Sequence, residues 1–405
     1  MSNEKAHNVT KKQVMPELRF KEFDGGVIEY LFNDVFHFST GKNIKQKEAS
    51  PEFETPCVRY GELYHMYREV IYDVINKTNL DESELLFSRG DEILLPSAGE
   101  DPLDIGSASA LTIKNVAIGR TINILRPIKE NIYSQIFASY YINQKLRKKI
   151  STLAKGSSIS NVYNSDLKTL KFNLPSLPEQ IKIASFLSAV DEKIQQLIKK
   201  KALLEQYKKG VMQQLFSGQL RFKPDLSGVE ENGNNYPDWK EKRLGDLCKT
   251  ITGKLDANAM KDDGEYRFYT CAREYFRIDE FAFDTEALLV SGNGANVGYI
   301  HYYKGKFNAY QRTYVLDGFE QNIFYIKKYL EKNLHERIHI EKKDGNTPYI
   351  TLSTLTEMKI EVPLLPEQQK IATYLSSIDT KTESVNQQIT QTQTFKKGLL
   401  QQMFV

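Results

Sequence analysis

One short motif in the sequence has the residue types of a zinc hydrolase. His335-Glu336-Arg337-Ile338-His339 places two histidines four residues apart with a glutamate between them. On a helix, this spacing can bind zinc while the glutamate acts as a base. The surroundings are unfavourable, because the segment is densely charged and a third ligand would have to come from Glu357 or Glu361, in a predicted strand. We therefore expect no metal site here.

A glycine-rich segment has the composition of a phosphate-binding loop. Gly292 to Gly298 follows the apolar run Ala287 to Val290, and a glycine-rich turn between a strand and a helix can cradle a phosphate or a nucleotide cofactor. Here the residues that follow, Tyr299 to Tyr303, predict another strand and no helix. We expect a tight turn, and no nucleotide site.

Two further kinds of catalytic site are poorly represented. Glu341-Lys342-Lys343 matches a fragment of a nuclease site, but such triplets arise often by chance. Base methylation calls for a short proline-containing motif such as NPPY, and the sequence contains no such tetrad. The chain is therefore expected to be non-catalytic and to hold no cofactor of its own.

Side chains suited to DNA contact occur in predicted turns or beside glycines, where they can project from the surface. Lysines are expected to contact phosphates, whereas Arg312 and Gln311 are better suited to base edges, because each can make two hydrogen bonds to one base. A strand-edge ion pair is an equally open role for Arg312. The candidates are Lys42, Asn43, Lys45, Lys47, Arg89 and Arg120 in the first half, and Lys254, Asn293, Asn296, Gln311, Arg312, Asn346 and Thr347 in the second.

An internal repeat indicates how these residues are positioned. Residues 174–217 align without a gap with residues 362–405, and 18 of 44 positions are identical. The identities concentrate at PxLPEQxKIA and KKGxxQQxF. Upstream, Leu18-Arg19-Phe20-Lys21 recurs at 220–223, and Thr40-Gly41-Lys42 recurs at 252–254. Such spacing is typical of two half-molecules in tandem, with one frame and two different inserts.

The two repeated segments are predicted to be long helices with an apolar seam. Apolar residues recur at alternating steps of three and four, which favours helices that pack against each other. Each helix would be about 57 Å long at 1.5 Å per residue, so we expect an antiparallel pair that projects between two domains. Two unrelated core helices are the alternative. The predicted seam is Ile183, Leu187, Val190, Ile194, Leu197 and Leu204 in the first helix, and Ile371, Leu375, Ile378, Val385 and Ile389 in the second.

The fold class follows from these elements. Short β-branched and aromatic runs predict strands in both inserts, and a helix is predicted before each exit, over 132–153 and 322–340. We expect an α+β fold, with two mixed domains separated by an antiparallel two-helix coiled coil and related by a pseudo-two-fold axis. The predicted divisions are a polar tail over 1–15, domain one over 16–173, a spacer helix over 174–217, a linker over 218–235, domain two over 236–361 and a second spacer helix over 362–405.

The bulk composition is that of a globular protein. The chain has 405 residues, 40% hydrophobic and 26% charged, and a formal net charge of +3. The polar segment from Met1 to Gln13 is unlike a signal peptide. Cys57, Cys248 and Cys271 are far apart and form no CxxC pair, which favours a reducing, cytoplasmic setting. No run of residues is long and apolar enough for a membrane span.

The repeated motifs resemble those of a known family. Leu177-Pro-Glu-Gln180 and Leu365-Pro-Glu-Gln368, each followed by KIA, are similar to segments of the specificity (S) subunits of type I restriction-modification systems. Arg19-Phe20 and Arg221-Phe222, with the two Gly-Lys pairs, resemble the starts of that family's target recognition domains. Gly345 to Ile350 resembles the loop before the last strand, whereas Gly156 to Asn161 lacks the Thr-Pro of its counterpart.

The resemblance implies a function and a set of partners. Each recognition domain would bind one half of a bipartite double-stranded DNA target, and the helices would set the gap and dock two modification (M) subunits. The M subunits would hold S-adenosylmethionine, and restriction (R) subunits would use ATP and magnesium, with no membrane involved. Two alternatives stay open: a coiled-coil scaffold that bridges partners without recognising a DNA sequence, and an enzyme that itself cuts or methylates DNA.

Overall fold

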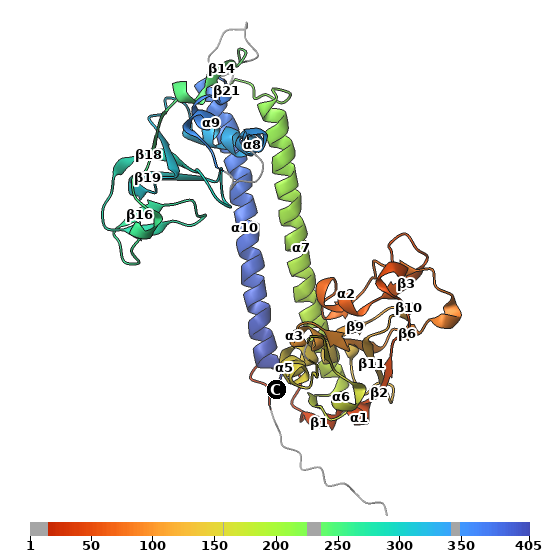
Figure 1. Cartoon of the computed structure of the whole chain (residues 1–405). Coiled ribbons are helices and arrows are strands. Elements are labelled where there is room, and N and C mark those ends of the chain that lie inside the picture. The colour runs from red at the N-terminus through yellow and green to blue at the C-terminus, as the bar shows by residue number, and fades with distance from the viewer. Residues whose placement is uncertain (1–14, 157, 225–235, 342–348) are drawn as a thin grey trace, which may run out of the picture. The chain divides into compact units, whose positions relative to one another are not determined.

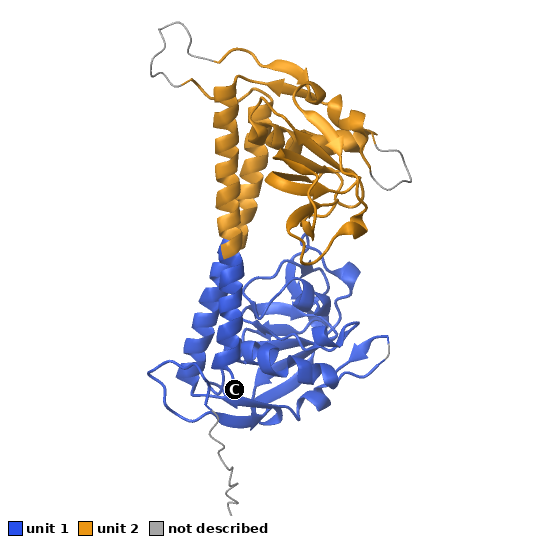
Figure 2. Cartoon of the chain, turned by 90° about the vertical axis from the view of Figure 1, so that its left-hand side faces the viewer, with its two compact units in different colours: residues 1–197, 388–405 blue, residues 198–387 orange. Residues whose placement is uncertain are grey.

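The computed structural model describes residues 15–156, 158–224, 236–341 and 349–405 (Figure 1). The chain forms two compact units, residues 1–197 with 388–405 and residues 198–387 (Figure 2). The boundary falls inside two long helices, α7 (Leu177–Phe216) and α10 (Leu365–Met403), so each unit contains part of both. In the described ranges, no helix has the length and apolar character of a membrane span.

The first unit holds a five-stranded sheet in the order β2-β11-β7-β9-β4 and a four-stranded sheet in the order β5-β3-β10-β6. Its strands are β1 (Ile28–Leu31), β2 (Phe36–Thr40), β3 (Thr55–Val58), β4 (Val70–Ile71), β5 (Lys77–Thr78), β6 (Phe87–Arg89), β7 (Glu92–Pro96), β8 (Ala98–Gly99), β9 (Ser109–Leu111), β10 (Lys114–Ile118), β11 (Ile122–Pro127), β12 (Ser160–Asn161) and β13 (Lys171–Leu174). Strand β1 pairs with β13, and β8 pairs with β12.

Short helices connect these strands. The helix predicted over 132–153 is three consecutive segments, α4, the π-helical η3 and α5, and Ser134 caps the first by accepting from the Phe137 amide. The helices of this unit outside α7 and α10 are α1 (Phe32–Val35), η1 (Gln46–Glu48), α2 (Tyr60–His65), η2 (Glu82–Glu84), α3 (Pro102–Ile105), α4 (Gln135–Tyr141), η3 (Ile142–Leu146), α5 (Arg147–Thr152) and α6 (Asn164–Leu167).

The second unit holds a six-stranded sheet in the order β15-β20-β18-β19-β16-β17 and the pair β14–β21. Its strands are β14 (Lys240–Arg243), β15 (Lys249–Thr252), β16 (Tyr266–Tyr269), β17 (Phe276–Ile278), β18 (Phe283–Ser291), β19 (Ile300–Ala309), β20 (Thr313–Asp317) and β21 (Lys359–Val362). Its shorter helices are η4 (Leu244–Asp246), η5 (Ala257–Ala259), α8 (Ile323–Glu341) and α9 (Leu352–Thr356). Both units are therefore mixed α and β, as the sequence predicts.

The long helices are part of the hydrophobic core of each unit. In the first unit, Phe36 and Phe172 of the domain share one buried cluster with Leu187 of α7 and Met403 of α10. In the second, Leu330 of α8 shares a cluster with residues of both long helices. The seam residues are buried except Leu204, which is half-buried: Ile183, Leu187, Val190, Ile194 and Leu197 in α7, and Ile371, Leu375, Ile378, Val385 and Ile389 in α10.

Polar contacts between α7 and α10 show the relative direction of the two helices. In the second unit, Lys201 Nζ donates to Asn386 Oδ1 at 2.9 Å, and Lys208 pairs with Asp379 at 2.5 Å. Residue numbers rise along α7 while those of the partners on α10 fall, so the helices run antiparallel. The Asp191–Lys396 pair of the first unit, at 2.7 Å, repeats the second contact at the equivalent positions of the internal repeat.

The repeated Glu-Gln dipeptide joins each domain to its helix. Glu179, 1% exposed, accepts two hydrogen bonds of 2.6 Å from Arg19. Its counterpart Glu367, fully buried, accepts from Arg221 at 3.0 and 2.7 Å and from the Trp239 indole at 3.0 Å. The Leu-Arg-Phe repeat therefore supplies the arginine that neutralises each buried carboxylate.

The glutamine beside each glutamate makes a second pair of equivalent contacts. Gln180 accepts from the Ser134 amide at 2.9 Å and donates to the Pro175 carbonyl at 2.8 Å. Gln368 accepts from the Asn322 amide at 2.9 Å and donates to the Pro363 carbonyl at 2.8 Å. The motif thus fixes the start of the long helix against the start of the domain's last large helix.

We expect Arg221→Met to destabilise the second unit by about 3 kcal/mol, because it leaves Glu367 charged, buried and without its cation. Adding Glu367→Gln should recover much of the loss, since the amide keeps an acceptor for Trp239. Urea unfolding followed by the fluorescence of Trp239, the single tryptophan of the chain, measures both. As a control, Arg243→Met breaks an exposed ion pair with Glu357 and should cost less than about 1 kcal/mol. Equal midpoints for Arg221→Met and Arg243→Met would contradict the assignment.

Candidate nucleic-acid interface

Four segments of the second unit meet at one edge of its six-stranded sheet. The Gln311 amide donates to the Leu255 carbonyl at 2.9 Å, and the Gly292 amide donates to the Arg312 carbonyl at 2.8 Å. The Asn296 side chain donates to the Cys271 carbonyl at 3.1 Å. The turns after β15, β16, β18 and β19 therefore form one continuous surface, which we call the turn surface of domain two (residues 252–256, 270–275, 291–299 and 310–313).

Five of the predicted DNA-contact residues of the second half lie on this surface. Lys254, Gln311 and Arg312 are exposed, and Asn293 and Asn296 are partly exposed. Gln311 Nε2 lies 3.4 Å from Asp256 Oδ2, which orients its amide without covering it. The structure thus places on one surface residues that lie up to 58 positions apart in the sequence. The other two candidates, Asn346 and Thr347, lie outside the described residues.

The first unit has a similar corner at the end of β2. The Lys42 amide donates to the Ile118 carbonyl at 3.0 Å, and the Arg120 amide donates to the Asn43 carbonyl at 3.0 Å. Lys42, Asn43 and Arg120 are exposed here, and so are Lys45 and Lys47 on the segment that follows. We call residues 41–47 with 119–121 the turn surface of domain one.

Two candidates in the first unit differ from the rest. Arg89 is exposed, but it pairs in register with Lys114 at the start of β10, whereas the turn surface adjoins Ile118 at the end of that strand. Asn43 has a positive φ of 46° and donates to the Glu84 carbonyl at 2.8 Å. Its amide therefore already stabilises the loop, a contact that its position in the sequence gives no sign of.

A close backbone approach explains the repeated Thr-Gly-Lys. A Cβ on Gly41 would lie 2.0 Å from the Gly119 carbonyl oxygen, and one on Gly253 would lie 1.9 Å from that of Ala309. Real side chains do not approach a backbone so closely, so only glycine lets these segments pack. Each glycine is followed by an exposed lysine on a rigid turn.

The chain matches a known protein family over most of its length. The family described as "Type I restriction modification DNA specificity domain" matches residues 29–206 and 236–393. The chain belongs to this family. The specificity subunit of the type I restriction enzyme EcoDI from Escherichia coli is 40% identical over 154 residues, which are 38% of this chain and 34% of that relative. The match therefore spans about a third of that relative's length.

Other type I specificity subunits match more of the chain. A putative one from Mycoplasma genitalium is 25% identical over 313 residues, 73% of this chain and 77% of that one. The crystal structure of a type I S subunit from M. genitalium has a TM-score of 0.66 at 18% identity, over 97% of this chain and 99% of that one. A structure from work on complex assembly and conformational transition of the type I R-M system has a TM-score of 0.53 at 17% identity, over 93% and 96%. Because both structures are less than 25% identical to this chain, their similarity shows a shared fold alone.

This member of the specificity family carries an arginine on its turn surface that sequence reasoning missed. Arg273 is exposed, and its Nε donates to Asn296 Oδ1 at 3.3 Å. Nearby, burial lowers the pKa of His301, whose Nε2 lies 2.9 Å from the Ala272 carbonyl and, facing an acceptor, donates to it. Arg273 lies in the turn after β16, and no motif or neighbouring glycine marks that turn in the sequence.

The three segments whose residue types resemble catalytic motifs lie in α8, in the turn between β18 and β19, and at the end of α8. His335, Glu336 and His339 are exposed on α8, and within the described ranges no group of three or more His, Cys, Asp and Glu residues could hold a metal. The glycine-rich segment 292–298 joins β18 to β19, so a strand follows it, as predicted. Of the nuclease-like triplet, Lys342 and Lys343 lie outside the described residues.

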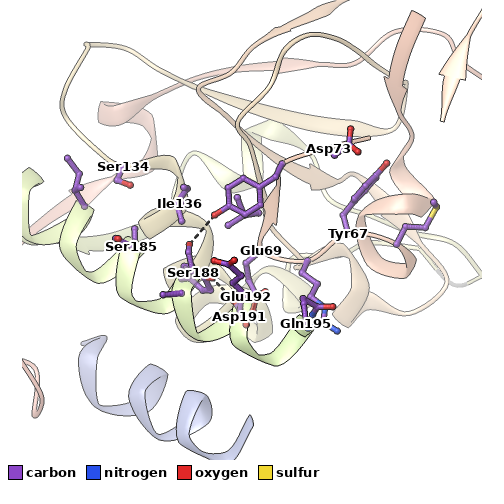
Figure 3. A pocket seen from close by; sticks show the side chains of 18 residues that line it. Tyr67, Glu69, Asp73, Ser134, Ile136, Ser185, Ser188, Asp191, Glu192 and Gln195 are labelled. Carbon is purple, nitrogen blue, oxygen red and sulfur yellow. Dashed lines mark hydrogen bonds between the residues drawn. The ribbon is translucent and has the colours of Figure 1, made fainter. Parts of the chain in front are cut away.

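A hollow of about 930 Å³ in the first unit lies between α7, α4 and the segment from Met66 to Asp73 (Figure 3). Its lining includes four carboxylates and one arginine, and two of the carboxylates, Glu69 and Asp191, are paired with Lys396. Asp191 also accepts from the Tyr140 hydroxyl at 2.5 Å. An acidic lining repels the phosphate backbone, so the turn surfaces are the better candidates for DNA contact.

Gly253→Ala should destabilise the second unit by about 2 kcal/mol or more, because the new methyl group would overlap the Ala309 carbonyl and force the turn surface apart. Gly210→Ala is the matched control. Gly210 lies inside α7, and a methyl group added there would meet nothing within 4 Å beyond its own stretch of helix, so the change should stabilise the helix by up to about 1 kcal/mol. Urea unfolding measures both variants. If Gly253→Ala unfolds at the wild-type midpoint, the close approach does not constrain the turn.

Proposed function

We propose that this family member is the DNA sequence-specificity subunit of a type I restriction-modification complex, in which each domain recognises one half of a bipartite target. The observation that carries the proposal is the pair of turn surfaces. Each is built on the same Thr-Gly-Lys turn, and each exposes a different set of polar and basic side chains. Two unlike recognition surfaces on one repeated frame fit two unlike half-sites.

The chemistry of the two surfaces supports a division of roles. Lys42, Lys45, Lys47 and Lys254 carry compact charges suited to phosphate, the contact that supplies most sequence-independent affinity. Arginine, asparagine and glutamine can make paired hydrogen bonds to a single base in the major groove. Arg120 of domain one and the Arg, Asn and Gln side chains of domain two are therefore the candidates for base recognition.

The long helices would set the gap between the half-sites and dock the partners. Helix α7 has 40 residues and α10 has 39, and at about 1.5 Å per residue each is longer than a small domain is wide. Both expose large apolar side chains, among them Leu203 (56%) and Phe395 (54%). Exposed apolar side chains of this size are available to pack against a protein partner.

The partners would supply the chemistry. Two modification subunits would bind S-adenosylmethionine and methylate adenine, and restriction subunits would use ATP and magnesium to move along and cut DNA. This chain would be a non-catalytic, cytoplasmic component that positions them on double-stranded DNA. Arg89, outside the turn surface of domain one, would contact phosphate at most.

A scaffold that bridges partners without recognising a sequence is the second candidate function. The exposed apolar side chains of α7 and α10 favour it equally, because they fit partner docking whether or not the domains bind DNA. The two functions differ in what the domains do, so an exchange of one domain separates them.

Replacing residues 16–173 with the corresponding domain of a relative should change one half-site and leave the other unchanged. The measurement is selection of bound duplexes from a randomised library by the complex of chain and modification subunits, before and after the exchange. The matched control replaces residues 236–361, and the opposite half-site should then change. A folded, partner-bound chimera that selects neither half-site would contradict independent recognition, and a wild-type complex that selects no sequence would favour the scaffold.

A further inference from the structure

The turn after β16 is held by several bonds from neighbouring segments. The Asn296 amide donates to the Cys271 carbonyl at 3.1 Å, and His301 Nε2 donates to the Ala272 carbonyl at 2.9 Å. The Ala272 amide lies 3.3 Å from Thr270 Oγ1. Neighbouring segments therefore hold the carbonyls of the two residues before Arg273, and the turn supports that side chain.

The guanidinium of Arg273 is itself oriented. Its Nε donates to Asn296 Oδ1 at 3.3 Å, and its centre lies 5.8 Å from the ring centroid of Tyr299. Asn296 thus uses its oxygen on the arginine and its nitrogen on the Cys271 carbonyl of the supporting turn. Within the described part of the chain, neither terminal nitrogen of Arg273 forms a hydrogen bond, and the residue is exposed.

An arginine held in this way is prepared for a planar ligand with two acceptors. Nη1 and Nη2, which bond to no described residue, present parallel donors, and in the DNA major groove guanine offers O6 and N7 at the matching spacing. Fixing the side chain beforehand lowers the entropy lost on binding. Arg312 is also exposed, but its guanidinium makes no hydrogen bond to another described residue and is therefore not oriented in this way.

We propose that Arg273 recognises a guanine of the second half-site, and that Asn296 is a positioning residue that holds the Arg273 guanidinium in place. This inference rests on the proposed function and deepens it. It also changes the role of Asn296 from the direct DNA contact that the sequence predicts to a support for the contact.

The test compares base preference among variants of the complete chain bound to modification subunits, with a library of randomised duplexes at fixed salt. Arg273→Ala should reduce the preference for guanine at one position of the second half-site by on the order of ten-fold or more. Arg273→Lys keeps the charge but loses the planar fork, so it should restore overall affinity and leave the preference low. Arg243→Ala, which removes an exposed arginine on β14, a strand that pairs with β21 outside the six-stranded sheet, should change neither.

The positioning role of Asn296 has its own readout. Asn296→Leu should lower preference at the same position as Arg273→Ala, and it should add nothing when Arg273→Ala is already present. A structural role alone would instead lower affinity for every sequence equally.

Three outcomes overturn the inference. Unchanged guanine preference in Arg273→Ala removes the base contact. A uniform loss of affinity that Arg273→Lys restores makes Arg273 a phosphate contact, with a salt slope lower by about one. Additive effects of Arg273→Ala and Asn296→Leu remove the positioning role. In each case the wild-type complex still selects a bipartite sequence, whereas failure of the proposed function would abolish selection by the wild type itself.

Discussion

The rest of the structure depends on one buried carboxylate at the start of each long helix, Glu179 in α7 and Glu367 in α10. Each is almost fully removed from solvent and neutralised by an arginine from the segment that leads into its own domain. Separating that segment from the helix would leave a buried charge unpaired, at a cost of several kcal/mol. The neighbouring glutamine extends the same constraint to the domain's last large helix. Within each unit, the entry segment, the helix before the exit and the long helix are therefore held as one body.

The buried pairs and the long helices must stay constant, whereas the side chains of the turn surfaces are free to differ. The turn surfaces lie on strands that pack against the frame, so their side chains can change without loss of the buried pair. Domain one presents Lys42 and Arg120, while domain two presents Lys254, Arg273 and Arg312. A glycine beside each lysine keeps the turn in place, because the facing carbonyl leaves no room for a methyl group. Under the proposed function, different DNA half-sites would then be recognised from equivalent supports.

Much of the architecture could be predicted from the sequence, because the repeat is local and periodic. The two long helices and their apolar seam follow from spacing and composition, although the helices begin at Leu177 and Leu365, three residues after the predicted starts. What could not be predicted involves partners far apart in the chain. Arg19 and Glu179 lie 160 positions apart, and nothing in a single sequence pairs them. For the same reason the sequence does not reveal the hydrogen bond between Arg273 and Asn296. Nor does it reveal that Arg89 lies beside the start of β10, whereas the other candidates of domain one lie near the end of that strand or beyond it.

The most direct test of the central claim is a genome-wide map of methylated adenines in cells that contain the modification subunits, with and without this chain. We predict methylation at a two-part motif with a fixed gap, present only when the chain is present. The half-site centres should lie near one helical turn apart, about 34–36 Å, if both domains bind one face of the duplex. Methylation that persists unchanged without the chain, or that follows a single continuous motif, would contradict the account.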